Sequence, residues 1–110
     1  MTIGQFLFLG TGSSSGVPVI GCSCSVCTSQ NSKNNRLRSS GLLTIGHKRL
    51  LVDVGPDFRQ QALSYGITSL DALFLTHTHF DHVGGLEELR AFTLKSSRKL
   101  PCYLSEESFE

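Results

Sequence analysis

A short apolar segment that runs directly into a cluster of metal-ligand residues constrains this chain most. The segment spans residues 72–75, and the cluster that follows contains His77, His79, Asp81 and His82. Imidazole nitrogens and carboxylate oxygens are ligands that suit Zn²⁺, Mn²⁺ or Fe. Ligand sites of α/β sheets gather at the carboxyl ends of strands. The pattern therefore predicts a metal centre at one edge of a sheet.

The spacing of these four residues suggests how they divide between ions. In an extended stretch, side chains two residues apart share a side, so His77, His79 and Asp81 are expected to converge. His82 is adjacent to Asp81 and is expected to point elsewhere, toward a second, neighbouring ion. Two adjacent metals can hold a bridging hydroxide and neutralise charge on an attacked oxyanion. The alternative is a polar loop with incidental histidines.

Three of the four cysteines form a second cluster, Cys22, Cys24 and Cys27, while Cys102 lies far along the chain. A bridge between Cys22 and Cys24 would close a tight, strained ring, which favours thiolates over disulfides. Three thiolates can fill three corners of a tetrahedral Zn²⁺ site. Cys102 and His47 are the substitutes for a fourth ligand within this chain, and no motif places either. Reduced cysteines without a metal are the alternative.

Composition bounds the class of protein. The chain has 110 residues, of which 39% are hydrophobic and 17% charged, as expected for one small soluble domain. A net charge of +1 gives no global electrostatic case for nucleic acid or an anionic membrane. No apolar run approaches the roughly 20 residues of a membrane span. The N-terminus lacks the features of a signal peptide, so a cytoplasmic location is expected.

The hydrophobic pattern predicts alternating strands and helices. Pro56 is expected to open a helix that buries Phe58, Ala62 and Tyr65 on one face and stops at Gly66. A second helix is expected at residues 86–93. The order is typical of an α/β fold. A loop spans residues 10–40, and its length calls for a functional reason, which the cysteines supply. Strands are expected at residues 5–9, 42–45, 50–54, 72–75 and 101–104.

Three segments together resemble the metallo-β-lactamase superfamily of metal-dependent hydrolases: residues 9–12, 51–55 and 76–86. Residues 16–18, 21–27 and 53–61 are similar to one branch of it. That branch includes the cyclic-phosphate phosphodiesterase of the carbon–phosphorus lyase pathway and is related to tRNA 3′-processing nucleases. The resemblance implies an αββα sandwich with the metals at one edge between two sheets. Residues 1–110 would form the N-terminal part of a single domain of this type.

The resemblance also assigns roles to the clustered residues. It implies that His77 and His79 bind a first metal and that Asp81 and His82 bind a second. Each metal would need further ligands, yet no histidine follows His82 and no aspartate follows Asp81. We therefore expect the N-terminal half of a longer protein, which alone would bind metal weakly and catalyse little. The cysteine cluster would hold a structural zinc, completed in the related phosphodiesterase by a C-terminal histidine.

The expected function is a metal-dependent phosphodiesterase that uses a hydroxide held between two divalent ions, Zn or Mn. Asp81 would orient this nucleophile. A small phosphodiester is the expected partner; nucleic acid is not supported by the charge, no membrane partner is expected, and a homodimer is left open. Alternatives on the same metal core are a thioester, a lactam or a tRNA 3′ end as substrate. The rival from another class is a non-catalytic zinc-binding module.

Three further polar residues have two interpretations each. Asp53 could hydrogen-bond the metal loop and so support its ligands, or it could cap the end of a strand. Arg36 and Arg38 could contact a phosphate, although solvated loop arginines are commoner.

Overall fold

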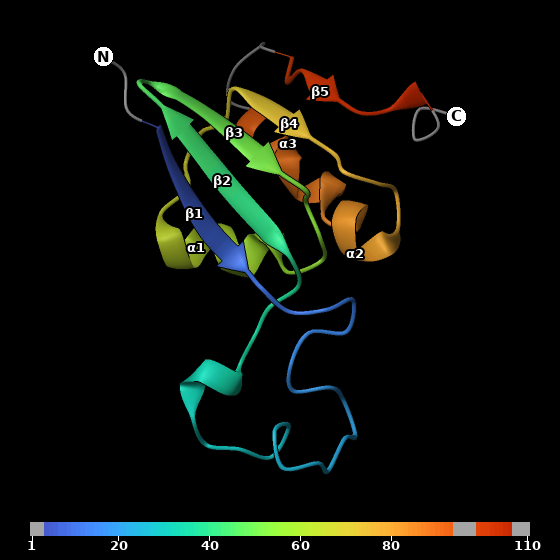
Figure 1. Ribbon diagram of the computed structural model, residues 1–110. Helices are drawn as coiled ribbons and strands as arrows, with labels where there is room; N and C mark the ends of the chain where they lie inside the picture. Colours follow the sequence, from blue (N-terminus) through green and yellow to red (C-terminus); the bar gives the residue numbers. More distant parts are fainter. Residues whose placement is uncertain (1–3, 94–98, 107–110) are drawn as a thin grey trace.

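One mixed five-stranded sheet forms the body of the protein in the computed structural model, which describes residues 4–93 and 99–106. The strand order follows the chain (Figure 1). The first three strands pair antiparallel, and the third, fourth and fifth pair parallel. The strands are β1 (Gly4–Gly10), β2 (Ser40–Ile45), β3 (Lys48–Val52), β4 (Ala72–Phe74) and β5 (Cys102–Tyr103).

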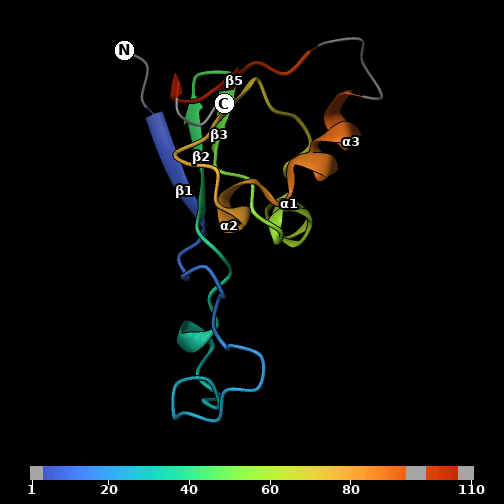
Figure 2. The same cartoon turned by 90° about the vertical axis from the view of Figure 1, so that its right-hand side faces the viewer.

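The three α-helices of the described residues cover the same face of this sheet (Figure 2). They are α1 (Phe58–Tyr65), α2 (Phe80–Val83) and α3 (Arg90–Thr93). Helix α2 was not expected from the sequence. The predicted helix at 86–93 is instead a 3₁₀ turn, η2 (Leu86–Leu89), followed by the single turn of α3.

Helix α1 begins two residues after Pro56 and ends, as expected, at Gly66. Gly66 has φ 65° and its N–H caps the carbonyl of Ala62, a left-handed geometry that glycine adopts at little cost. The predicted buried face is only partly right. Phe58 is fully buried, but Tyr65 is 49% exposed and Gln61 is buried in its place.

The covered face of the sheet carries the hydrophobic core. Leu42, Leu51 and Leu73 come from three adjacent strands and are almost fully buried against the helices. Each such leucine stabilises the fold by roughly 1.5–3 kcal/mol relative to an exposed one. Because side chains alternate across a strand, the intervening residues point to the opposite face. Exposed hydrophobic residues on β1, β2, β4 and β5 include Phe6, Phe8, Ile45, Phe74 and Tyr103.

The exposed apolar side chains show that the described residues supply one sheet and its helices, which is half of the layers in an αββα sandwich. Exposed apolar side chains gathered on one face of a sheet mark a surface that packs against something. The chain's contribution to the fold is therefore a sheet with one covered and one uncovered face.

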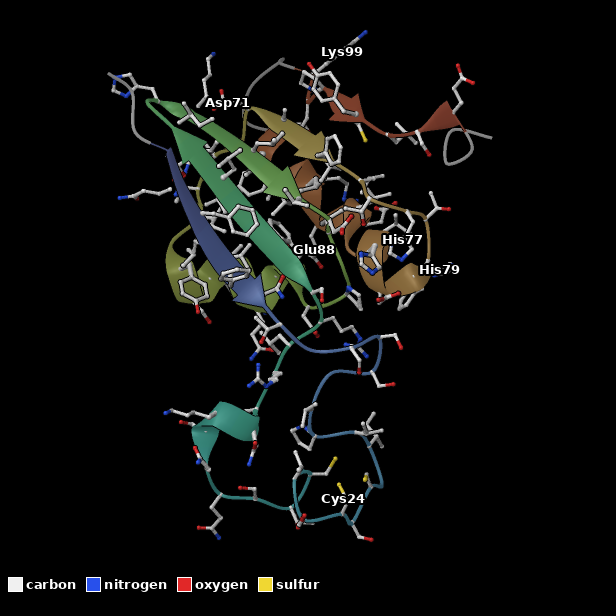
Figure 3. All side chains as sticks on the ribbon, viewed as in Figure 1. Cys24, Asp71, His77, His79, Glu88 and Lys99 are labelled. Carbon is white, nitrogen blue, oxygen red and sulfur yellow. The ribbon has the colours of Figure 1, made fainter. Side chains whose placement is uncertain are left out.

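Residues 11–39 form an arm that leaves the sheet between β1 and β2 (Figure 1). Its two sides are linked near the sheet by isolated bridges, Gly12 to Arg38 and Val17 to Arg36. A 3₁₀ turn, η1 (Ser32–Asn34), lies farther out, where Asn31 caps it by accepting the Lys33 N–H. The cysteine cluster lies at the tip of this arm (Figure 3).

No helix in the part of the chain that the structure describes combines the length and the apolar character needed to cross a membrane.

Two glycines allow the loop after β3 to pack directly against the loop after β4. The Val54 N–H donates to the His82 carbonyl at 2.9 Å, and the Gly85 N–H donates to the Val54 carbonyl at 2.9 Å. A Cβ on Gly85 would overlap the carbonyl oxygen of Gly55, and one on Gly55 would overlap the carbonyl oxygen of Asp81. The backbone contact therefore needs both glycines. It fixes the loop of residues 77–82, called the histidine-rich loop below, to the sheet.

We expect Gly85→Ala to destabilise the full-length protein by about 1–3 kcal/mol, because the new methyl group must push the two loops apart. The matched control is Gly4→Ala, where the Cβ would meet Ile45 Cγ1 at 3.4 Å in ordinary contact. Urea unfolding followed by circular dichroism measures both. Equal stability of the two variants would contradict the proposed loop contact.

Candidate metal centre

Strand β4 leads into the histidine-rich loop, which lies at the edge of the sheet. Three imidazoles gather there: the His77 ring centroid lies 4.8 Å from that of His79 and 3.8 Å from that of His82. Figure 3 shows His77 and His79 together beside α2. The expected juxtaposition of His77 and His79 is thus present, while their role as metal ligands stays a prediction.

The expected direction of His82 is wrong. The loop is extended only as far as His79, which has ψ 150° and precedes the first residue of α2. Asp81 and His82 therefore lie in a helical turn, where the argument from alternating sides does not hold. The turn brings the His82 ring back against His77 and places its Nε2 2.9 Å from Asp81 Oδ2.

His82 lies between two carboxylates. Its Nδ1 is 2.7 Å from Asp53 Oδ2, and its Nε2 is 2.9 Å from Asp81 Oδ2. A neutral imidazole carries one N–H and can satisfy only one of these oxygens. The contact between His82 Nε2 and Asp81 Oδ2 therefore needs a further proton, on either residue, or a cation bound by both atoms. An imidazole nitrogen and a carboxylate oxygen are two donors that suit a divalent metal. His77, His79 and Asp81 do not converge as a set of three, however, so further ligands would have to come from elsewhere.

Asp53 hydrogen-bonds the histidine-rich loop, as its first interpretation expects, while its support of metal ligands stays a prediction. Its carboxylate is buried. Its oxygens accept the Thr76 N–H at 2.8 Å, the Thr76 hydroxyl at 2.7 Å and the His82 Nδ1–H at 2.7 Å. Asp53 has φ 61°, so β3 ends at Val52, before the predicted end of the strand. Such a backbone geometry costs about 1–3 kcal/mol, which these bonds offset.

Arg38 is half-buried and paired within the chain, so it is not a solvated loop arginine, and its contact with a phosphate stays a prediction. Its Nη1 pairs with Asp57 Oδ1 at 2.9 Å, its own N–H donates to Asp57 Oδ2, and its Nε donates to the Ser14 carbonyl. Arg36 donates from Nη1 to the hydroxyl of Thr11. These bonds tie the arm to itself and to the start of α1. Sequence reasoning missed Asp57, although its position beside Pro56 offered a signal.

The three clustered cysteines converge as expected and are free thiols. Their sulfurs all lie within 4.8 Å of one another, and within the described ranges no other set of three potential ligands does so. Backbone N–H groups of Val19 and Cys27 point to Cys27 Sγ and Cys24 Sγ at 3.4 Å. The geometry fits a zinc ion with a fourth ligand from elsewhere. Neither Cys102, on β5, nor His47, exposed in the β2–β3 turn, joins the group.

The cysteine sulfurs differ in acidity. The Cys27 N–H, followed by contact with the Cys22 thiol, lowers the pKa of Cys24 to about 7. The Val19 N–H lowers the pKa of Cys27, but contact with the Cys22 thiol and desolvation outweigh it, so the net shift is upward. Burial raises the pKa of Cys102. Cys24 is therefore more readily present as the thiolate than Cys27 or Cys102.

In metal-free protein, we expect iodoacetamide to modify Cys24 faster than Cys102 at neutral pH, because the thiolate is the nucleophile. The Cys24 rate should rise from pH 6 and level off above its pKa of about 7, while the Cys102 rate keeps rising to higher pH. Mass spectrometry of digested protein gives each rate. A common pH profile for both cysteines would contradict this assignment.

Comparison with known proteins agrees with this geometry. A structure described as a new diphosphatase from the PhnP family superposes with a TM-score of 0.93 at 40% identity, covering 99% of this chain and 44% of that one. The metallo-β-lactamase fold protein YhfI from Bacillus subtilis superposes with a TM-score of 0.67 at 23% identity, covering 94% of this chain and 38% of that one. The expected fold is thereby confirmed, as is the resemblance to the phosphodiesterase branch.

A curated relative, the octanoyltransferase of Porphyromonas gingivalis strain W83, is 54% identical over 98 residues. The match covers 88% of this chain but only 20% of that protein, so the chain spans a fifth of the relative's length. The family model described as Anti-Pycsar protein Apyc1 matches residues 5–110, which is almost the entire chain. The chain has the metallo-β-lactamase fold and belongs to the Anti-Pycsar protein Apyc1 family.

Proposed function

We propose that this chain forms part of a metal-dependent hydrolase that cleaves phosphodiesters. The observation that carries the proposal is the position of His82, whose two ring nitrogens each face a carboxylate while its ring lies against His77. The 40% identity to the PhnP-family diphosphatase supports phosphorus as the reacting centre.

Different residues of the loop would bind different metal ions. His77 and His79 would hold a first ion and Asp81 with His82 a second, with further ligands from other parts of the protein. Zn²⁺ or Mn²⁺ suits these donors. Divalent ions at such a centre supply a hydroxide at neutral pH and neutralise the charge that develops on the phosphate.

Asp81 is the proposed catalytic residue. Its side chain is only 15% exposed, and that of His82 only 13%. Carboxylate and imidazole groups shielded from water in this way interact more strongly with a cation or a polarised hydroxyl than exposed groups do. Asp81 would bind a metal ion and orient the attacking oxygen toward phosphorus.

The cysteine cluster would bind a separate, structural zinc. It lies at the tip of the arm, away from the labelled histidines (Figure 3). Free sulfurs that already converge, with N–H groups pointing at two of them, need little rearrangement to bind an ion. Zinc here would hold the arm in shape and take no part in hydrolysis.

A diphosphate is the second candidate substrate, because the PhnP-family structure is described as a diphosphatase. The same ligand set could polarise either kind of phosphate. The charge of +1 offers no support for a tRNA 3′ end, and no residue geometry described above favours a thioester or a lactam. A non-catalytic zinc-binding module remains the rival from another class, and it predicts metal binding without turnover.

We expect Asp81→Asn in the full-length protein to slow hydrolysis of bis(p-nitrophenyl) phosphate by about 10²- to 10⁴-fold, because it removes a ligand and the group that orients the nucleophile. Glu88→Gln is the matched control, since Glu88 is exposed on η2, and its rate should stay within about twofold of the parent. Chelation should abolish turnover, and Zn²⁺ or Mn²⁺ should restore it.

Turnover that survives chelation, or an Asp81→Asn variant as fast as the parent, would overturn the proposed mechanism. Parallel assays with a diphosphate distinguish the two candidate substrates. Metal binding without turnover of either would favour the non-catalytic module.

A further inference from the structure

The hydroxyl of Thr76 has three polar neighbours. Its Oγ1 lies 2.7 Å from Asp53 Oδ2, 3.0 Å from His77 Nδ1 and 3.5 Å from His82 Nδ1. Thr76 directly precedes the histidine-rich loop and is not itself a metal-ligand type. Neither the sequence pattern nor the proposed mechanism uses it.

Counting protons decides the direction of each bond. A hydroxyl has one proton to donate, and an ionised carboxylate can only accept. The short contact with Asp53 therefore takes the Thr76 proton, because without it two oxygen atoms with lone pairs would face each other at 2.7 Å. Toward His77, the Thr76 oxygen is then an acceptor, and His77 Nδ1 must carry the hydrogen.

His82 is oriented by the same carboxylate. Its Nδ1 donates to Asp53 Oδ2 at 2.7 Å, which leaves Nε2 on the side of Asp81. The hydrogen bond made by one ring nitrogen decides which tautomer a histidine adopts. Asp53 thus sets the tautomer of His82 directly and that of His77 through Thr76.

We propose that Thr76 is a positioning residue for His77. Its hydroxyl donates to Asp53 and accepts from His77 Nδ1, which holds the His77 ring in the Nδ1–H tautomer and leaves Nε2 free to bind a metal ion. The tautomer follows from the contacts within this chain, whereas the binding of a metal by Nε2 rests on the proposed function. Partners of this kind typically change metal affinity by 10- to 100-fold when removed.

The test compares Thr76→Val, which replaces the hydroxyl by a methyl group, with Thr76→Ser, which keeps it. Thr78→Val is the matched control, because Thr78 lies in the same loop and is exposed. All are made in the full-length protein. Nitrogen-15 NMR of the metal-free protein, above the pH at which the imidazoles lose their second proton, reports which ring nitrogen of His77 carries hydrogen. Isothermal titration with Mn²⁺ or Zn²⁺ then gives metal affinity.

We expect the parent, Thr76→Ser and Thr78→Val to show hydrogen on His77 Nδ1, and Thr76→Val to lose this preference. Metal affinity should fall about 10-fold or more in Thr76→Val alone. A Thr76→Val protein that keeps the parent's His77 tautomer would overturn the proposal, and so would a parent with hydrogen on Nε2. If the tautomer changes as expected but the parent binds no metal at the loop, the relay stands and the proposed function fails.

Discussion

The buried carboxylate of Asp53 is the interaction on which the arrangement of the site depends. It accepts hydrogen bonds from the backbone and the hydroxyl of Thr76 and from the ring of His82. These groups belong to the loop after β4, whereas Asp53 follows β3. One side chain therefore joins the ends of two parallel neighbouring strands. Because a buried charge must be paired or hydrogen-bonded, Asp53 and the loop hold each other in place.

The turn after β3 also organises the arm. Asp57 lies four residues beyond Asp53 and binds both the backbone and the guanidinium of Arg38. Arg38 in turn donates to the carbonyl of Ser14 on the opposite side of the arm. The base of the arm and the histidine-rich loop are thus both fixed to residues 53–57. Residues 53–57 therefore contact both the loop that carries one predicted metal site and the base of the arm that carries the other.

The sequence predicts most of the sheet, because alternating or continuous apolar runs mark strands β1 to β4 within a few residues. The convergence of the cysteine cluster was also predicted, since C-x-C-x-x-C spacing places three sulfurs within one short loop. The short helix α2 was not predicted, because one helical turn has no periodicity to detect, and His82 was misplaced for that reason. Helical spacing placed Tyr65 on the same face as Phe58, but Tyr65 is 49% exposed and Gln61 is buried.

We propose that the chain carries two separate sets of metal ligands, one in the histidine-rich loop and one in the cysteine cluster. The direct measurement is metal content by mass spectrometry after the full-length protein is dialysed against Zn²⁺, compared among the parent, Cys24→Ser and His77→Ala. The account predicts that Cys24→Ser loses about one ion per chain and keeps the metal of the histidine-rich loop, while His77→Ala does the reverse. Unchanged metal content in both variants, or complete loss in either, would contradict it.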